Sequence, residues 1–249
     1  PVAKARALAK NGQLSAAVIE LKNFLRAYPN HAEGHLELAN VFLQGNDGVG
    51  AEKEYRLALQ NGYSMDTVVD GLGASLLLQG QGARLLKEFT ADKFAGELKA
   101  RVHLLRAQVH FSLSELDFAK KEVAAAQAVA PNYFGVHLAL ARLKQVSGDL
   151  SAAETEVDAA LKLAPSNVEA QLFKGELLGG QGNFDGALGY FDAVLAANKN
   201  DLRAKLGRVA TLISLKNPTL AEADVDEVLK RASGSPLAIY FKAQLLAAR

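Results

Sequence analysis

The chain has 249 residues, 49% of them hydrophobic, and its 28 lysines and arginines nearly balance its 27 aspartates and glutamates. This balance argues against a dedicated nucleic-acid binder, which usually carries a clustered basic excess. The lack of cysteine excludes disulfides, zinc–thiolate sites and thiol chemistry. No apolar run reaches the roughly 18 residues that span a bilayer, so the sequence predicts no membrane span.

Small residues recur along the chain at a period of 34 residues. One column, in which Leu85 takes the skipped position, consists of Ala17, Ala51, Ala119, Ala153, Ala187 and Ala221. A second column consists of Ala5, Ala39, Gly73, Ala107, Ala141, Gly175 and Val209. Two antiparallel helices approach closely only where side chains are small. Two such columns at this period are typical of a helix-turn-helix solenoid, in which each helix pair buries its apolar face on the next pair.

The period predicts an all-α chain and a single solenoid of seven helix pairs and a last helix. The repeats are expected near residues 1–30, 31–64, 65–96, 97–132, 133–166, 167–200 and 201–234, with the last helix at 236–248. In chain order the predicted helix pairs cover 2–11 and 14–28, 31–45 and 48–62, 66–79 and 83–89, 97–113 and 116–129, 133–147 and 150–163, 167–181 and 184–197, and 201–216 and 219–232. Because the chain begins inside a helical pattern and ends one helix into a new repeat, we expect a fragment of a longer repeat protein.

The third repeat is irregular. Leu85 occupies the slot of a small residue, the second helix is short, and residues 90–96 read as a looser connection. One interpretation is a harmless variant of the repeat. The other is a hinge or recognition loop, because functional residues concentrate on loops.

The sequence shows no catalytic constellation, and we expect no enzyme activity, no cofactor and no metal site. The Gly-x-Gly pairs, such as Gly80 and Gly82, fit turns better than nucleotide loops. His35, His103 and His137 share one repeat position, which makes a shared metal site conceivable. Successive repeats lie ~9–10 Å apart, however, which is too far for two imidazoles to share an ion without a third ligand. Semi-buried packing histidines are the favoured interpretation.

The repeat resembles the tetratricopeptide repeat (TPR). Leu38-Ala39, Leu72-Gly73 and Leu140-Ala141 resemble its Leu-Gly pair, whereas its opening tryptophan is absent. The later aromatic, the second alanine and the terminal proline of the pattern correspond to Tyr55 and Phe191, to Ala58, Ala126 and Ala160, and to Pro29, Pro131 and Pro165. The resemblance implies a right-handed superhelix whose first helices line a concave groove for a protein or peptide partner.

The family's recognition positions supply the candidate partner-binding residues. Mapped onto this sequence, they are Leu36, Asn40, Leu43, Asp70, Leu77, Leu104, Gln108, Phe111, Leu138, Arg142, Gln145, Leu172 and Glu176. The alternative is that the leucines belong to the core between helices. The Lys/Asn clamp that some TPR adaptors use for a partner's C-terminal carboxylate is missing. Binding of polysaccharide would need aromatic residues in the groove, and only Phe111 is a candidate.

A finer resemblance rests on residues 16–25 (AAVIELKNFL), 32–48 (AEGHLELANVFLQGNDG), 51–62 (AEKEYRLALQNG) and 76–89 (LLLQGQGARLLKEF). These stretches are similar to the TPR lipoproteins of the exosortase (PEP-CTERM) system, called PrsT. The resemblance implies a scaffold in the bacterial periplasm or envelope that serves exopolysaccharide production or protein sorting, with an anchoring cysteine upstream. The alternatives are a docking arm of a larger polysaccharide-secretion protein or enzyme, and a cytoplasmic location.

Overall fold

The computed structural model describes residues 1–247, which form α-helices and one short 3-10 turn and contain no strand. The helices are α1 (Val2–Lys10), α2 (Leu14–Ala27), α3 (Ala32–Gln44), α4 (Gly48–Gln60), α5 (Met65–Leu78), α6 (Gly82–Glu88), α7 (Gly96–Ser112), α8 (Leu116–Val129), α9 (Phe134–Val146), α10 (Leu150–Leu163), α11 (Val168–Gly180), α12 (Phe184–Ala197), α13 (Leu202–Ser214), α14 (Pro218–Arg231) and α15 (Pro236–Ala247). The all-α prediction is confirmed, and each bound lies within two residues of its expected place. The expected end of the last helix at residue 248 lies outside the described residues.

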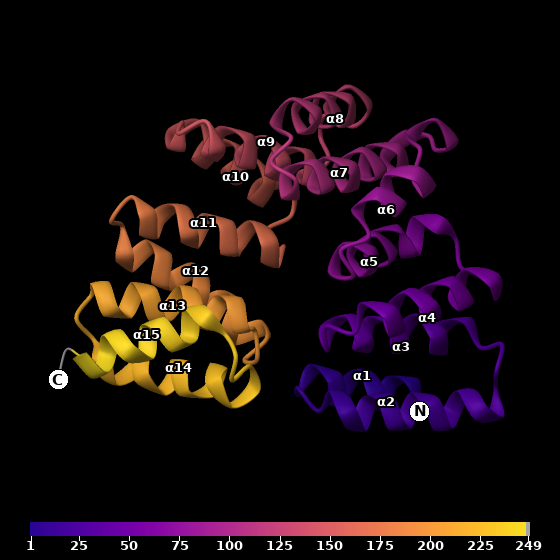
Figure 1. Ribbon diagram of the computed structural model, residues 1–249, viewed down its shortest axis with the longest axis horizontal. Helices are drawn as coiled ribbons and strands as arrows, with labels where there is room; N and C mark the ends of the chain where they lie inside the picture. The colour runs from indigo at the N-terminus through magenta and orange to yellow at the C-terminus, as the bar shows by residue number, and fades with distance from the viewer. Residues whose placement is uncertain (248–249) are drawn as a thin grey trace. The chain divides into compact units, whose positions relative to one another are not determined.

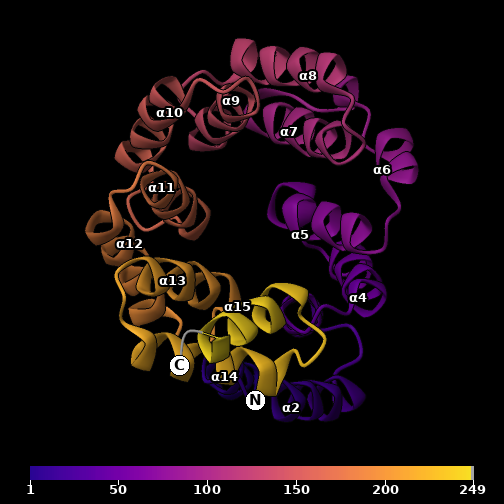
Figure 2. The same cartoon turned by 60° about the vertical axis from the view of Figure 1, so that its left-hand side comes forward.

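The chain divides into two compact units, an N-terminal unit of residues Pro1–Ala139 and a C-terminal unit of residues Leu140–Arg249. We call the odd-numbered helices, which open each repeat, A helices and the even-numbered ones B helices. In the N-terminal unit the A helices α1, α3, α5 and α7 contact one another in succession (Figure 1). In the C-terminal unit α11, α13 and α15 do the same, and Figure 2 shows them along one face with α12 beside α11 and α13. Each unit is therefore a stack of helix pairs.

The two small-residue columns form the tightest part of both stacks. Every alanine of the first column, from Ala17 to Ala221, is fully buried, and so is Leu85 in the skipped slot. Gly175, in the second column, shows why size matters, because a Cβ there would lie 2.9 Å from the ring of Phe191. The short side chains allow A and B helices to touch along their length, as the period predicts.

In every repeat the residue two places before the B helix has a positive φ, and this residue is glycine in repeats one, three, five and six. In repeat five Gly148 adopts a φ of 81°, a conformation that glycine reaches without strain. Asp149 follows and caps α10, its side chain accepting a 3.0 Å hydrogen bond from the backbone N–H of Ala152. Asp47 and Asn183 cap α4 and α12 in the same way. A side-chain cap thus marks the start of α4, α10 and α12, whereas α2, α6, α8 and α14 begin without one.

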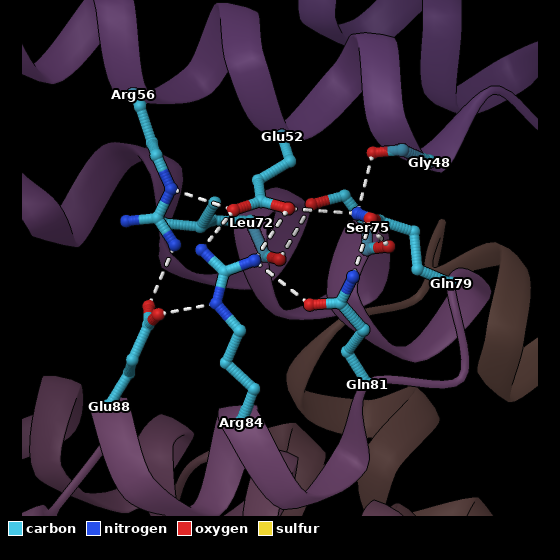
Figure 3. A network of polar contacts seen from close by, with 9 residues as sticks. All are labelled: Gly48, Glu52, Arg56, Leu72, Ser75, Gln79, Gln81, Arg84 and Glu88. Atoms are coloured by element: carbon cyan, nitrogen blue, oxygen red, sulfur yellow. Dashed lines mark hydrogen bonds and ion pairs between the residues drawn. The ribbon is translucent and has the colours of Figure 1, made fainter.

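The third repeat departs from this plan, as its sequence predicts. Its B helix, α6, has only seven residues and is followed by the 3-10 turn Ala91–Lys93. A polar network then fixes this short helix to α4 and α5, as Figure 3 shows. Buried Glu52 of α4 accepts hydrogen bonds of 2.8 Å from Arg56 and 2.6 Å from Arg84. Both arginines also bind Glu88, at 2.7 and 2.6 Å.

These four side chains form a charge quartet, in which each arginine lies between the two glutamates. Gln79, the C-cap residue of α5, also donates to Glu52 at 2.9 Å (Figure 3). Burial acts to raise the pKa of Glu52, but hydrogen bonds from Gln79 and the two arginines outweigh it, so that its pKa is lowered. The ion pairs of the quartet therefore hold the short α6 in place, where a full-length B helix would pack through more apolar contacts.

Candidate functional site

The A helices of the N-terminal unit carry a hollow between α1 and α3. Its volume is about 480 Å³, and its lining consists of Arg6, Glu37, Asn40, Leu43 and Gln44. Asn40 and Leu43 are two of the predicted partner-binding residues, and the structure brings them together here. Arg6 spans the hollow from α1 and donates to Glu37 of α3 at 2.6 Å.

Tyr55 of α4 lies behind this hollow, where it contacts the lining residue Asn40, and we call this place the groove floor. Its ring lies against the backbone of α5, because a Cβ on Gly71 would be 2.2 Å from Tyr55 Cζ. Its hydroxyl reaches α3 and donates a 2.7 Å hydrogen bond to Oδ1 of Asn40. Because the Asn40 oxygen accepts this bond, its N–H₂ group points away from Tyr55. The two amide hydrogens of Asn40 then remain for a partner.

Arginine bridges link neighbouring A helices of the N-terminal unit at two places. On α1, Arg6 binds Glu33 and Glu37 of α3. These hydrogen bonds raise the pKa of Arg6, and the bond to Glu37 has the larger effect. On α7, Arg101 binds Asp66 at 2.9 Å and the predicted residue Asp70 at 2.7 Å, both on α5. The order along this face is arginine, two glutamates, two aspartates, arginine.

These carboxylates change the acidity of two tyrosines. Burial, and then the charges of Glu37 and Asp70, raises the pKa of Tyr55 to about 12. Burial and Asp70 likewise raise the pKa of Tyr133, which precedes α9, to about 12, although Arg101 acts in the opposite direction. Burial is the largest cause of both rises, and the nearby carboxylates add to it.

The A-helix face of the C-terminal unit is also bridged by arginines, but its balance of positive and negative charges is different. Arg203 of α13 binds Glu169 at 2.7 Å and the predicted residue Glu176 at 2.9 Å. Arg142, also predicted, lies 3.5 Å from Glu169. A second, smaller hollow of about 230 Å³ lies between α11 and α13, where Gly175, Gly179, Gly180, Gly207 and Ala210 are among the lining residues. Here two arginines meet two glutamates.

The predicted leucines lie at the base of the A-helix face rather than on its surface. Leu36, Leu43 and Leu77 are half-buried and pack against the core of the N-terminal unit. Leu104, Phe111 and Leu138 are also half-buried, whereas Gln108 and Gln145 are exposed. Leu172 is the exception, because it is 3% exposed within the core of the C-terminal unit. Leu172 therefore fits the alternative interpretation, in which the predicted leucines belong to the core between helices.

Two of the three histidines of the shared repeat position, His35 and His103, lie in separate hydrogen-bonded pairs. His35 Nδ1 lies 2.6 Å from Glu54, and its Nε2 donates to the carbonyl of Pro29 at 2.8 Å. His103 Nδ1 likewise lies 2.6 Å from Glu122. In both pairs the glutamate follows the histidine by 19 residues. Within residues 1–247 no group of three or more His, Asp or Glu side chains is placed to hold a metal ion.

Sequence reasoning missed the residues that face each other from different repeats. Glu37, Asp66 and Arg101 belong to this group, and Tyr55 was recognised only as a repeat aromatic. The available signal was the spacing of about 31 residues from Arg6 to Glu37 and from Asp70 to Arg101, close to one period. In the described part of the chain no helix is long and apolar enough to cross a membrane.

Comparison with known proteins decides the family. The tetratricopeptide repeat model matches residues 2–63, 138–197 and 174–236, which together make up well over half of the chain. The chain belongs to the tetratricopeptide repeat family. The unmatched stretch between residues 63 and 138 contains the TPR repeat with the short α6 and the charge quartet. Its departure from the family pattern agrees with the helix lengths observed there.

Solved structures agree on the TPR fold. A chain of the APC/C hetero-tetramer Cut9-Hcn1 is 16% identical, with a TM-score of 0.66 over 97% of this chain and 48% of that one. The chain thus spans about half the length of that relative. A TPR protein from Parabacteroides merdae is 18% identical, with a TM-score of 0.55 over 87% and 86% of the two chains. A search of curated proteins found no match. The fold class is therefore a TPR solenoid, and TPR proteins generally serve as scaffolds for protein partners.

Proposed function

We propose that this protein is a non-enzymatic scaffold that binds a protein partner on the A-helix face of its N-terminal unit. The observation that carries the proposal is the hollow between α1 and α3, which Asn40, with two amide hydrogens not used by Tyr55, and the apolar side chain of Leu43 both line. An amide donor beside an apolar surface fits a peptide, whose carbonyl accepts from Asn40 while a side chain covers Leu43.

We also propose, from the resemblance of residues 16–25 and 51–62 to PrsT, that the setting is a bacterial envelope system for exopolysaccharide production or protein sorting. The nearly balanced charge and the lack of cysteine are compatible with a scaffold in such a compartment.

Site-specific photocrosslinking tests the proposal. The natural chain has no cysteine, so one introduced cysteine is a unique attachment point for a crosslinker. Gln44→Cys places the crosslinker at the rim of the hollow, and Lys53→Cys places it on an exposed part of α4 as a matched control. Each labelled protein is mixed with a bacterial envelope extract and irradiated, and the adducts are identified by mass spectrometry.

The expected result is a defined protein adduct from Gln44→Cys that is weak or absent from Lys53→Cys. Adding Asn40→Ala to the Gln44→Cys protein is expected to reduce that adduct. Equal adducts from both positions, or an adduct that persists in the Asn40→Ala protein, would overturn the groove proposal. An adduct with a sorting or polysaccharide-assembly protein would support the envelope setting, and adducts only with unrelated proteins would count against it.

A further inference from the structure

Two neighbouring A helices of the N-terminal unit carry four carboxylates that bind arginines. Glu33 and Glu37 lie on α3, and Asp66 and Asp70 lie on the next A helix, α5. Tyr55 feels the charges of both Glu37 and Asp70, so a carboxylate from each helix acts on the same point of the groove floor. We call these four carboxylates the α3–α5 band.

The arginines stand at the two edges of this band rather than within it. Arg6 approaches from α1 and Arg101 from α7, and each binds two of the four carboxylates. Two positive charges therefore face four negative ones. Lys10, at the end of α1, does not line the hollow, and Glu97 adds to the negative field at Tyr133. Among the six side chains of these bridges, the negative charges exceed the positive ones by two.

The aspartates of the band are open to a ligand even though they are paired. The side chains of Asp66 and Asp70 are 66% and 58% exposed, whereas that of Arg101 is only 13% exposed. The guanidinium thus lies beneath the carboxylates, whose outer lone pairs face solvent. A carboxylate accepts several hydrogen bonds at once, so a second cation can bind from above.

The C-terminal unit supplies an internal comparison. Its A-helix face places Arg142 and Arg203 on either side of Glu169 and Glu176, so that the charges balance. The bridging side chains therefore carry more negative than positive charges in the N-terminal unit and equal numbers of both in the C-terminal unit. Charge complementarity favours a cationic partner over the first face and gives no such preference over the second.

We propose that the partner of the N-terminal groove is an extended polypeptide segment carrying arginine or lysine side chains, which bind over the α3–α5 band while an apolar neighbour covers Leu43. This inference deepens the proposed function and rests on it. Neighbouring A helices pack at ~8–10 Å, and in a polyproline II segment residues i and i+3 lie on the same side ~9 Å apart. Basic residues three apart would thus meet the aspartates of α5 and, on α3, Glu33, whose side chain is 47% exposed, whereas that of Glu37 is only 13% exposed.

Peptide selection followed by matched variants tests this inference. Random peptides of about 12 residues, long enough to cross the face when extended, are selected on the full chain by phage display. We expect the selected peptides to be enriched in pairs of arginine or lysine at i and i+3. The best peptide is synthesised with a fluorescent label, and its dissociation constant is measured by anisotropy at low and at physiological salt.

The variants separate charge from folding. Asp66→Asn with Asp70→Asn is expected to weaken binding by about tenfold at low salt and less at high salt, because the charges are solvent-exposed. Glu169→Gln with Glu176→Gln, in the balanced C-terminal face, is the matched control and is expected to leave binding within about twofold. Arg6→Gln removes a positive edge and is expected to tighten binding by a few-fold. Glu33→Gln tests the other half of the band without stripping Arg6 of its partner Glu37.

Two results would overturn the inference while leaving the scaffold proposal standing. One is a selected peptide set without basic enrichment whose binding depends on Asn40. The other is unchanged affinity in both Asp66→Asn/Asp70→Asn and Glu33→Gln, with circular dichroism showing that both proteins are folded. If no selected peptide binds in solution, or if binding ignores Asn40 as well as the band, the proposed groove and the basic partner both fail.

Discussion

The hydroxyl of Tyr55 on α4 donates a 2.7 Å hydrogen bond to Asn40 on α3, while the Tyr55 ring lies against Gly71 on α5. One side chain of a B helix thus reaches between two A helices and fixes the group that we assign to peptide binding. The relation makes the candidate site a property of two repeats rather than of one helix.

Replacing Tyr55 with phenylalanine tests this relation directly. The ring, and with it the packing on Gly71, is kept, but the bond to Asn40 is lost. We expect a loss of about 1 kcal/mol, which lowers the melting temperature of a chain of this size by ~2–4 °C. Peptide binding should weaken as well, since the Asn40 amide is free to turn. Tyr190→Phe, in the C-terminal unit, is the control and should leave peptide binding unchanged.

Tyrosine ionisation provides a test without mutation. Burial and nearby carboxylates raise the pKa of both Tyr55 and Tyr133 from 10.0 to about 12. A raised pKa in the folded state means that the associated stability is complete below the unfolded value near 10 and is lost as the pH rises toward 12. Absorbance titration should show a phase near pH 12 with the amplitude of two of the six tyrosines. Tyr55→Phe should halve it, and an undiminished phase would contradict the assignment.

The charge quartet should make repeat three sensitive to acid. Glu52 has a lowered pKa, so its contribution to stability is present above the ordinary value of 4.5 and is lost as the pH falls below it. We expect Glu52→Gln to cost about 1.5–3 kcal/mol at pH 7, because two arginines lose a charged acceptor. The difference from the natural protein should shrink in urea unfolding at low pH.

A matched control for the quartet is Glu20→Gln, which removes a carboxylate from the surface pair with Lys4. A surface pair contributes ~0–1 kcal/mol, so the control should change stability little. Hydrogen exchange adds a local readout, since Glu52→Gln should speed exchange in α6 more than in α12. Equal costs for the two substitutions would show that the quartet does not hold the short helix.

The pair formed by His35 and Glu54 is structural and can be separated into its two bonds. His35→Leu removes both and leaves the buried carboxylate of Glu54 without its partner, which should cost about 1–3 kcal/mol. His35→Gln should cost less, because glutamine can still donate to the carbonyl of Pro29. Gln171 does this in repeat six, where its Nε2 donates to Pro165 at 2.9 Å. Thermal unfolding of both variants checks the order, and equal losses would contradict it.

The small-residue column predicts that opposite changes of size at two of its positions are both destabilising. Ala153 is fully buried, so Ala153→Leu should overpack the helix pair and cost ~1–3 kcal/mol. Leu85 fills the same slot in repeat three and is also fully buried, so Leu85→Ala should leave a cavity and cost ~2–5 kcal/mol. Chemical denaturation measures both, and a neutral Leu85→Ala would show that the slot adapts to either size.

The helices themselves could be predicted because they depend on local chemistry. The 34-residue period placed each helix pair, and the turn sequence around Gly148 and Asp149 located the start of α10 at Leu150. The small-residue columns identified the buried contacts, since packing two helices at close distance leaves little choice of side chain. Leu172 shows where the pattern ran out, because the same repeat position is half-buried at Leu36 and buried at Leu172.

The sequence by itself thus determined the fold family, the helix boundaries and the positions that form the contact between paired helices, all of which follow from periodicity. Only the tertiary structure decided which polar side chains meet across repeats: Arg6 with Glu37, Tyr55 with Asn40, and Arg84 with Glu52. A period tells which helices are neighbours. It does not tell which of several long, charged side chains on them reach one another, because that choice depends on helix rotation and on the space left by residues such as Gly71.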